Sequence, residues 1–292
     1  MRTEGKAMSD NSEKEYPLVS IIIRTCGRPR VLRRALESVK RQTYPNIETV
    51  LVEDGMNVSE RFIKKYYPDR NIRYFSTGEH VGRCRAGNIG LEKANGKYLN
   101  FLDDDDILLE EHVALLVKEL ENSEHRVAYA IAEEHQFVRD PQNEHRMRIR
   151  RKCIKYKQPF NRLLLCYMNY FPIQSVLFEK KVYEENGGFD ESLEIFEDWD
   201  MWLRFALHND FLYVPEVTSV YYTPFKGKNK KKRDIGMRTV EEEAVDKHLQ
   251  YMVQMNAKQI RDEMDYILNV FNKKRLLFYM QKIRNYLLYR DY

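Results

Sequence analysis

The chain has 292 residues, of which 43% are hydrophobic and 32% are charged, and its formal net charge is only +4. This length predicts one large domain or two small ones, and the hydrophobic fraction is sufficient for a core, so the composition indicates a globular protein. No run of about 18 apolar residues is present, which excludes a typical transmembrane helix, and residues 1–16 lack the apolar stretch of a signal peptide. We expect residues 1–16 to form a disordered leader.

The cysteines indicate a reducing compartment. They form no CxxC pair and show no metal-ligand spacing. Free thiols are typical of cytosolic proteins. The sequence therefore predicts a cytoplasmic protein without a zinc site, and its cysteines are Cys26, Cys84, Cys153 and Cys166.

Segments with strand and helix patterns alternate through about the first 125 residues. The first segment, LVSIII, is β-branched and apolar on both faces, as a central parallel strand would be. Pro29 suits the start of the helix that follows it. The predicted strands cover residues 18–23, 48–52, 72–75 and 97–102, and the predicted helices cover residues 31–39, 59–67, 86–94 and 110–121. This alternation predicts an α/β fold in which helices flank a mostly parallel sheet.

Two of the predicted strands end in acidic residues. One is followed by Glu53-Asp54-Gly55 and the other by the tetrad Asp103–Asp106. Ligands of such sheets bind beyond the carboxyl ends of the strands. Adjacent carboxylates repel one another unless a cation or solvent neutralises them, and Mg²⁺ and Mn²⁺ prefer carboxylate oxygens. The tetrad is therefore predicted to bind a divalent cation, and the alternative is an acidic turn that caps the helix over 110–121.

The alternation weakens after a further predicted strand over 127–131. Residues 135–157 are polar and rich in Arg and Lys, which predicts a loop or an exposed hairpin. A strand over 173–178 follows, and then a helix over 180–186 that a Gly-Gly pair ends. Residues 196–205 place two tryptophans on one helical face and acidic residues in the first turn, where they either take part in chemistry or complement the helix dipole.

Taken in order, these motifs resemble those of the family 2 glycosyltransferases, which are inverting enzymes of the GT-A fold that use nucleotide sugars. The resemblance covers about residues 17–223. It rests on the first strand through Arg28-Pro29, on Val52-Glu53-Asp54-Gly55, on Gly82 through Asn88 to Gly90, on the run into Asp103–Asp106, and on Gly187-Gly188-Phe189-Asp190 followed by Glu197-Asp198. We accordingly expect a Rossmann-like GT-A domain over 17–225.

The resemblance also implies roles for individual residues. Asp198 would be the general base that removes the proton of the acceptor hydroxyl, and Glu197 is the reserve candidate. Asp105 would be the direct metal ligand and Asp103 would touch the metal or the ribose, with Mn²⁺ or Mg²⁺ stabilising the leaving diphosphate. Contacts to the donor nucleotide are expected from Thr25, Arg28, Asp54, Arg83, Asn88, Asp103 and Asp104.

Two features depart from the pattern common among such enzymes. Many of them carry Pro and Asn in the first loop, where this chain has Arg24 and Gly27. Many also carry Arg immediately before the Asn of the later motif, where this chain has Gly87. Arg83 and Arg85 are the candidates to supply the displaced charge to the diphosphate, and the alternative is that both are solvated surface residues.

Basic residues gather late in the chain. Residues 226–233 hold six Lys or Arg in eight positions, and we expect a flexible loop over 226–238. This loop would close over the diphosphate, lie against anionic lipid, or remain solvated. Residues 239–292 predict a helical extension whose last part combines an apolar stripe with basic and aromatic residues. Such a helix is typical of docking on its own domain or on a second subunit of a homodimer, and also of peripheral contact with the inner face of a membrane.

The predicted function is metal-dependent, inverting transfer of a sugar from a nucleoside diphosphate donor. A UDP-sugar is favoured, with dTDP and GDP open, and the acceptor would be a hydroxyl of a surface polysaccharide, glycolipid or glycoprotein glycan. One alternative is a nucleotidyltransferase, for which Thr25 to Pro29 would be a poor phosphate loop. The other is a nucleic-acid-binding protein that uses the basic tail, which the acidic strand ends oppose; we expect no nucleic acid partner.

Overall fold

The apolar segment near the start of the chain forms the centre of a parallel sheet. In the computed structural model, which describes residues 16–68, 71–140, 143–193, 195–226, 247–248 and 250–270, this segment is β1 (Val19–Thr25). It pairs in parallel with β2 (Ile47–Glu53) on one side and with β4 (Tyr98–Asp103) on the other, and β3 (Ile72–Ser76) pairs with β2. All seven residues of β1 are buried because both faces of the sheet are covered.

Successive residues of β1 supply two hydrophobic cores, one on each face of the sheet. Ile21 and Ile23 belong to the core that α1 (Pro29–Lys40), α2 (Glu60–Tyr66) and α4 (His112–Glu121) cover. Ile22 belongs to the core that α3 (Arg83–Lys93) and α7 (Glu197–Ala206) cover. This period-two division explains why β1 carries apolar residues on both of its faces.

The second half of the chain extends the same sheet. β8 (Val176–Glu179) pairs antiparallel with β4, and β6 (Val127–Asp140) follows it. β9 (Phe211–Pro224) pairs in parallel with β6, and β5 (Ile107–Leu108) pairs with β9. The strand order is β3-β2-β1-β4-β8-β6-β9-β5. The predicted α/β fold with a mostly parallel sheet is confirmed.

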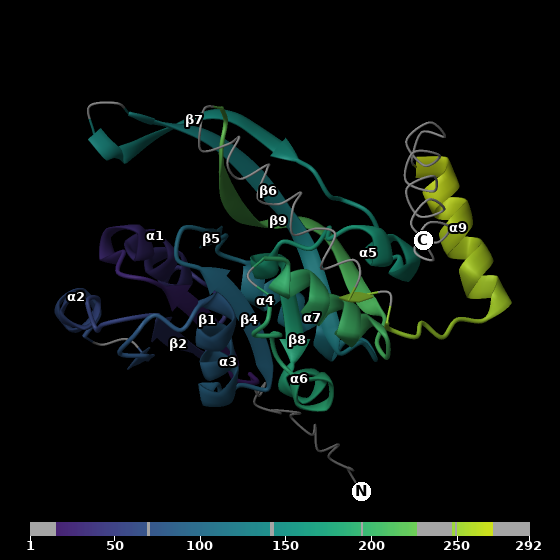
Figure 1. Ribbon diagram of the computed structural model, residues 1–292, viewed down its shortest axis with the longest axis horizontal. Coiled ribbons are helices and arrows are strands. Elements are labelled where there is room, and N and C mark those ends of the chain that lie inside the picture. Colours follow the sequence, from purple (N-terminus) through teal and green to yellow (C-terminus); the bar gives the residue numbers. More distant parts are fainter. Residues whose placement is uncertain are drawn as a thin grey trace, which may run out of the picture.

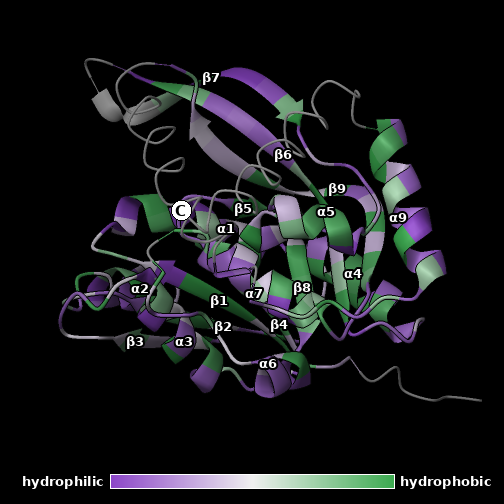
Figure 2. Cartoon of the chain, turned by 45° about the vertical axis from the view of Figure 1, so that its right-hand side comes forward, coloured by the Kyte–Doolittle hydropathy of each residue, from purple (hydrophilic) through white to green (hydrophobic). Residues whose placement is uncertain are grey.

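The basic segment over 135–157 is a hairpin rather than a loop. β6 runs on to Asp140 and turns into β7 (Asn143–Ile154), which pairs with it antiparallel. Figure 1 shows this hairpin extending away from the body of the molecule, and Figure 2 shows that most of β7 is hydrophilic. The predicted strand over 127–131 was therefore too short, because β6 continues as a polar strand between β7 and β9.

Other elements differ from the prediction in detail. The segment over 173–178 begins with a 3₁₀ turn (Ile173–Ser175) before β8, and α5 (Arg162–Tyr167) was not predicted. The helix over 180–186 is present as α6 (Lys180–Asn186), and it ends at Gly187 with φ of 78°. Beyond residue 246, α9 (Ala257–Val270) contacts α5.

Several predictions fall on residues that the structure does not describe. These are the leader except for Tyr16, the basic block except for Lys226, and the apolar stripe near the end of the chain. Within the described ranges, no helix is long and apolar enough to cross a membrane.

Candidate active site

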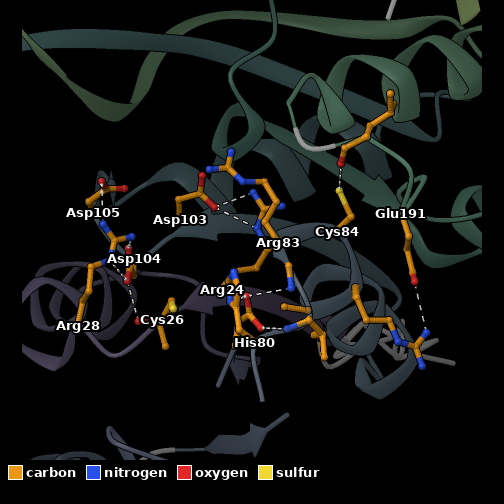
Figure 3. A pocket seen from close by; sticks show the side chains of 17 residues that line it. Arg24, Cys26, Arg28, His80, Arg83, Cys84, Asp103, Asp104, Asp105 and Glu191 are labelled. Carbon is orange, nitrogen blue, oxygen red and sulfur yellow. Dashed lines mark hydrogen bonds and ion pairs between the residues drawn. The ribbon is translucent and has the colours of Figure 1, made fainter. Parts of the chain in front are cut away.

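A cavity of about 720 Å³ opens where β1, β2 and β4 end. Its walls come from the residues after these three strands, from the loop into α3, and from Glu191 and Leu193 before α7. Figure 3 shows carboxylates and guanidinium groups turned toward one another across it. The parallel strands thus bring acidic segments that lie far apart in the sequence to one edge, as the sequence predicted for Asp54 and the tetrad.

The aspartate tetrad divides into two exposed and two buried carboxylates. Asp103 and Asp105 line the cavity with side chains that are 33% and 44% exposed. Asp104 and Asp106 are buried, at 0% and 8%, although Asp104 is also part of the cavity wall. β4 ends at Asp103, and the residues after it form a turn in which the Asp106 N–H donates to the Asp103 carbonyl at 3.1 Å, so the turn directs the four carboxylates to different sides.

Asp104 is held by the first loop. It accepts a hydrogen bond from the Thr25 hydroxyl at 2.6 Å and a charge-assisted pair of bonds from Arg28. Burial raises the pKa of Asp104 to about 6. Both Thr25 and Asp104 were expected to contact the donor nucleotide. In the structure their side chains are hydrogen-bonded to each other.

Asp106 is held by the backbone of β9, a strand of the same sheet. It accepts a hydrogen bond from the backbone N–H of Tyr222 in β9 at 3.2 Å. Burial and the charges of Asp105 and Asp103 raise its pKa well above the ordinary value. Burial and the charge of Asp103 also raise the pKa of Asp105. These carboxylates therefore destabilise one another's charged forms, which a bound cation would relieve.

A buried arginine links the tetrad to α7. Arg24 donates to Asp103 Oδ1 from Nη2 at 2.8 Å and to Glu197 Oε1 from Nη1 at 3.0 Å, and its side chain is only 7% exposed. Burial lowers the pKa of Arg24, but the charges of Asp103 and Glu197 outweigh this effect and raise it above its ordinary value. Burial likewise raises the pKa of Asp103, and the Arg24 charge and hydrogen bonds hold it below its usual range. Asp103 is therefore ionised beside this guanidinium, which also binds the Glu197 side chain.

Glu197 and Asp198 begin α7 in different environments. Glu197 is paired with Arg24 and lies 3.7 Å from the Arg83 guanidinium. Asp198 accepts the backbone N–H of Trp199 at 2.8 Å, and burial and the charge of Glu197 raise its pKa to about 7. Neither carboxylate is among the residues that line the cavity. The pKa of Asp198 suits a general base near neutral pH.

The backbone before α7 is held in an unfavourable conformation. Phe196 has φ of 66°, and among the described residues it is the single non-glycine residue with positive φ. Such a conformation costs of the order of 1–3 kcal/mol and persists only where the surrounding structure fixes it. It directs Glu197 and Asp198 into the first turn of the helix.

The loop into α3 surrounds Asp54. The carboxylate accepts backbone N–H bonds from Val81 at 2.7 Å and Gly82 at 3.2 Å, and His80 Nδ1 lies 2.7 Å from it. The neighbouring Glu53 is fully buried instead and accepts bonds from Ser59. Asp54 therefore lines the cavity, as predicted, while Glu53 is part of the fold.

Asn88 does not line the cavity. Its amide donates to the Phe189 carbonyl at 2.9 Å and to Glu191, and its carbonyl accepts the Phe189 N–H at 2.8 Å. This side chain joins α3 to the segment that leads into α7. The other expected donor contacts, Arg28 and Arg83, line the cavity with side chains that are 50% and 58% exposed.

The sequence analysis did not assign a role to Arg24 or His80. Arg24 stands opposite Asp103 in the parallel register of β1 and β4, so the sequence held a signal for that ion pair. The structure also explains Gly87, because an added Cβ there would lie 2.5 Å from the Phe189 ring and 3.4 Å from Arg24 Cδ. Arg24, rather than Arg83 or Arg85, is the arginine that lies against this glycine.

The tetrad fits a hard divalent cation. Asp103 and Asp105 present carboxylate oxygens to the cavity, and oxygen ligands of this kind suit Mn²⁺ and Mg²⁺. Only one oxygen of Asp103 is engaged by Arg24, and the contact of Asp105 with Arg28 is long, at 3.8 Å.

The chain is similar to known proteins over most of its length. The model of the family described as Glycosyl transferase family 2 matches residues 20–185, more than half of the chain. The uncharacterized glycosyltransferase YwdF of Bacillus subtilis is 28% identical over 221 residues, which cover 75% of this chain and 79% of that protein. Rickettsia relatives are longer, and the chain spans 27% to 61% of their length.

Solved structures share the fold. The structure of S. aureus TarS 1–349 in complex with UDP-GlcNAc matches 83% of this chain and 69% of that chain, with a TM-score of 0.62 and 16% identity. The mannosyltransferase PcManGT from Pyrobaculum calidifontis, in complex with GDP-Man and Mn²⁺, matches 95% of this chain and 82% of that chain, with a TM-score of 0.54 and 15% identity.

Proposed function

Since the chain belongs to glycosyltransferase family 2 and is a glycosyltransferase, we propose that it transfers a sugar from a nucleoside diphosphate donor, with UDP favoured, to an acceptor hydroxyl with inversion. The observation that carries this proposal is the division of the tetrad. Asp103 and Asp105 face a cavity that Asp54 borders at the end of a neighbouring strand. Complexes of TarS with UDP-GlcNAc and of PcManGT with GDP-Man and Mn²⁺ support a donor of this class.

We propose that the donor binds at the carboxyl ends of β1, β2 and β4. Asp54, fixed by the backbone of the α3 loop, would accept hydrogen bonds from the nucleoside. Arg28 and Arg83 would face the diphosphate, because both are exposed at the cavity and carry charges that a diphosphate attracts. When held by Asp103 and Asp105, Mn²⁺ or Mg²⁺ supplies positive charge that stabilises the leaving diphosphate.

The buried polar residues would act indirectly. Thr25 and Asp104 bond to each other, and Asp104 holds Arg28 at the cavity edge. Asn88 positions the backbone at Phe189. We therefore propose that Thr25, Asp104 and Asn88 shape the donor site rather than contact the donor.

Asp198 is our candidate for the general base. Its pKa of about 7 leaves a useful fraction of the carboxylate ionised at neutral pH while keeping it basic enough to accept the acceptor's proton. Glu197 is less suited to this role because its carboxylate is held by Arg24. The proposed acceptor is a hydroxyl of a surface polysaccharide, a glycolipid or a glycoprotein glycan.

The test is a thermal-shift screen of UDP, GDP, dTDP and CDP, each with and without Mn²⁺. A ligand at 100 times its dissociation constant should stabilise the fold by about 2.7 kcal/mol. We expect one nucleotide to stabilise the chain in a Mn²⁺-dependent manner, and Asp105→Ala to lose that dependence. Absence of a shift with every nucleotide would contradict the proposed donor site.

Asp198→Asn separates binding from chemistry. The variant should retain the Mn²⁺-dependent shift with the preferred nucleotide and lose turnover by about 10²- to 10⁴-fold, the usual contribution of general base catalysis. Hydrolysis of the donor sugar can be followed where the acceptor is unknown. Full turnover in Asp198→Asn would rule out this residue as the base.

A further inference from the structure

Three side chains of different chemistry meet at the β1–β2 end of the cavity. Cys26 follows β1 and His80 lies in the loop before α3 (Figure 3). Asp54 follows β2. One ligand atom from each, a thiol sulfur, a carboxylate oxygen and an imidazole nitrogen, lie within 4.8 Å of one another. We propose that Cys26, Asp54 and His80 bind Zn²⁺ at a site separate from Asp103 and Asp105.

The donor set selects the metal. Zn²⁺ takes thiolate, imidazole and carboxylate ligands, and three protein ligands with an open fourth position are typical of its reactive sites. Mg²⁺ and Mn²⁺ instead prefer the all-oxygen set that Asp103 and Asp105 offer. The cavity would therefore contain a hard-metal site and a softer one side by side.

Small side-chain movements would bring the three ligand atoms to zinc-binding distances. Zinc–ligand bonds of about 2.0–2.3 Å place tetrahedral ligands roughly 3.3–3.8 Å apart. The Cys26 and His80 side chains are exposed and can change rotamer, and Cys26 forms no disulfide. His80 Nδ1 lies 2.7 Å from Asp54 Oδ2, so Zn²⁺ would replace this direct contact. Asp54 is buried and fixed by the N–H groups of Val81 and Gly82, which orient its carboxylate as outer-shell partners do in metal sites.

Sequence spacing could not reveal this site. The three ligands come from three separate strand ends, whereas zinc motifs are recognised by ligands a few residues apart. The absence of such spacing around the cysteines led to the prediction of no zinc site, and the folded sheet edge provides the ligands instead.

The site has a consequence that rests on the proposed function. Asp54 would serve both Zn²⁺ and the nucleoside of the donor, so the two ligands should exclude each other. By linkage, a nucleotide that weakens Zn²⁺ binding is itself bound more weakly when Zn²⁺ is present, by the same factor.

The experiment measures metal binding by the full chain without any nucleotide. Zn²⁺ affinity is obtained by competition with a chromophoric chelator, and Co²⁺ is added separately to look for a sulfur-to-cobalt charge-transfer band. Outer-shell partners alone change metal affinity about 10- to 100-fold, so Cys26→Ser and His80→Ala should each weaken Zn²⁺ binding by at least about 10-fold. Cys26→Ser should also abolish the cobalt band. Both substituted residues are exposed, so the variants should fold.

Two controls make the result specific. His208→Ala removes another exposed histidine, and Asp105→Ala disables the proposed hard-metal site, and both should retain the Zn²⁺ affinity of the wild type. Unchanged Zn²⁺ affinity in Cys26→Ser, or a wild type without a cobalt band, would overturn the proposal. These measurements need no donor, so a failure of the proposed function would leave them intact and is detected separately by the nucleotide screen.

Discussion

Arg24→Met tests whether one guanidinium holds the tetrad and α7 together. Methionine keeps an apolar stem between the Phe189 and Phe101 rings, which lie 5.2 and 5.7 Å from the guanidinium carbon, and removes only the charge and its hydrogen bonds. The carboxylates of Asp103 and Glu197 would then lose the partner that they share.

The size of the effect follows from burial. Removing one partner of a buried ion pair typically costs about 3–5 kcal/mol, because the remaining charge is left uncompensated. The Glu197 side chain is 4% exposed, so its charge would remain buried without a partner. The Asp103 side chain is 33% exposed, so solvent would partly stabilise its charge. We therefore expect Arg24→Met to lower the free energy of unfolding by about 3 kcal/mol, at the lower end of that range.

The assay is urea unfolding at pH 7 with linear extrapolation. Arg83→Met is the matched control, because Arg83 lies 3.7 Å from the same Glu197 carboxylate but is 58% exposed, and it should cost less than about 1 kcal/mol. The double variant Arg24→Met/Glu197→Gln also lacks the unpaired charge of Glu197, so it should be more stable than Arg24→Met alone. A loss below about 1 kcal/mol in Arg24→Met, or a double variant less stable than the single one, would refute the reasoning.

Three further outcomes are expected. Glu197→Gln removes a negative charge beside Asp198, so the pKa of Asp198 should fall from about 7. The acid limb of the pH profile of kcat/KM should therefore move to lower pH. An unchanged acid limb would mean that Asp198 is not the titrating group. Gly87→Ala places a methyl group against the Phe189 ring. After the gain in helix propensity is subtracted, the free energy of unfolding measured in urea should fall by about 1–2 kcal/mol. A more stable variant would contradict this packing. Tyr251→Phe removes a 2.8 Å hydrogen bond to a buried carboxylate of α7 and should lower the free energy of unfolding by about 1–2 kcal/mol, whereas an unchanged midpoint would show that residue 251 does not dock there.

The sheet and the position of the site could be predicted from the sequence because both depend on local patterns. The run from Val19 to Ile23 is apolar on both faces, with Ser20 as its single polar residue, and this pattern is typical of a strand that is covered on both sides. Asp54 directly follows β2 and Asp103 is the last residue of β4, and parallel strands bring their carboxyl ends to one edge. The course of the chain from 127 to 157 was less predictable, since a polar strand and a polar loop have similar compositions.

What individual side chains do at that edge was decided by tertiary structure. The tetrad consists of four identical residues, yet Asp104 is buried and hydrogen-bonded to Thr25 and Arg28, whereas the side chains of Asp103 and Asp105 are partly exposed. Arg24 looked like a departure from a motif until the fold placed Glu197, 173 residues away, on its other side. Hydrophobic periodicity determines which face of an element is buried, but ionic pairing depends on which elements meet, and only the assembled sheet and α7 bring those charges within a few ångströms.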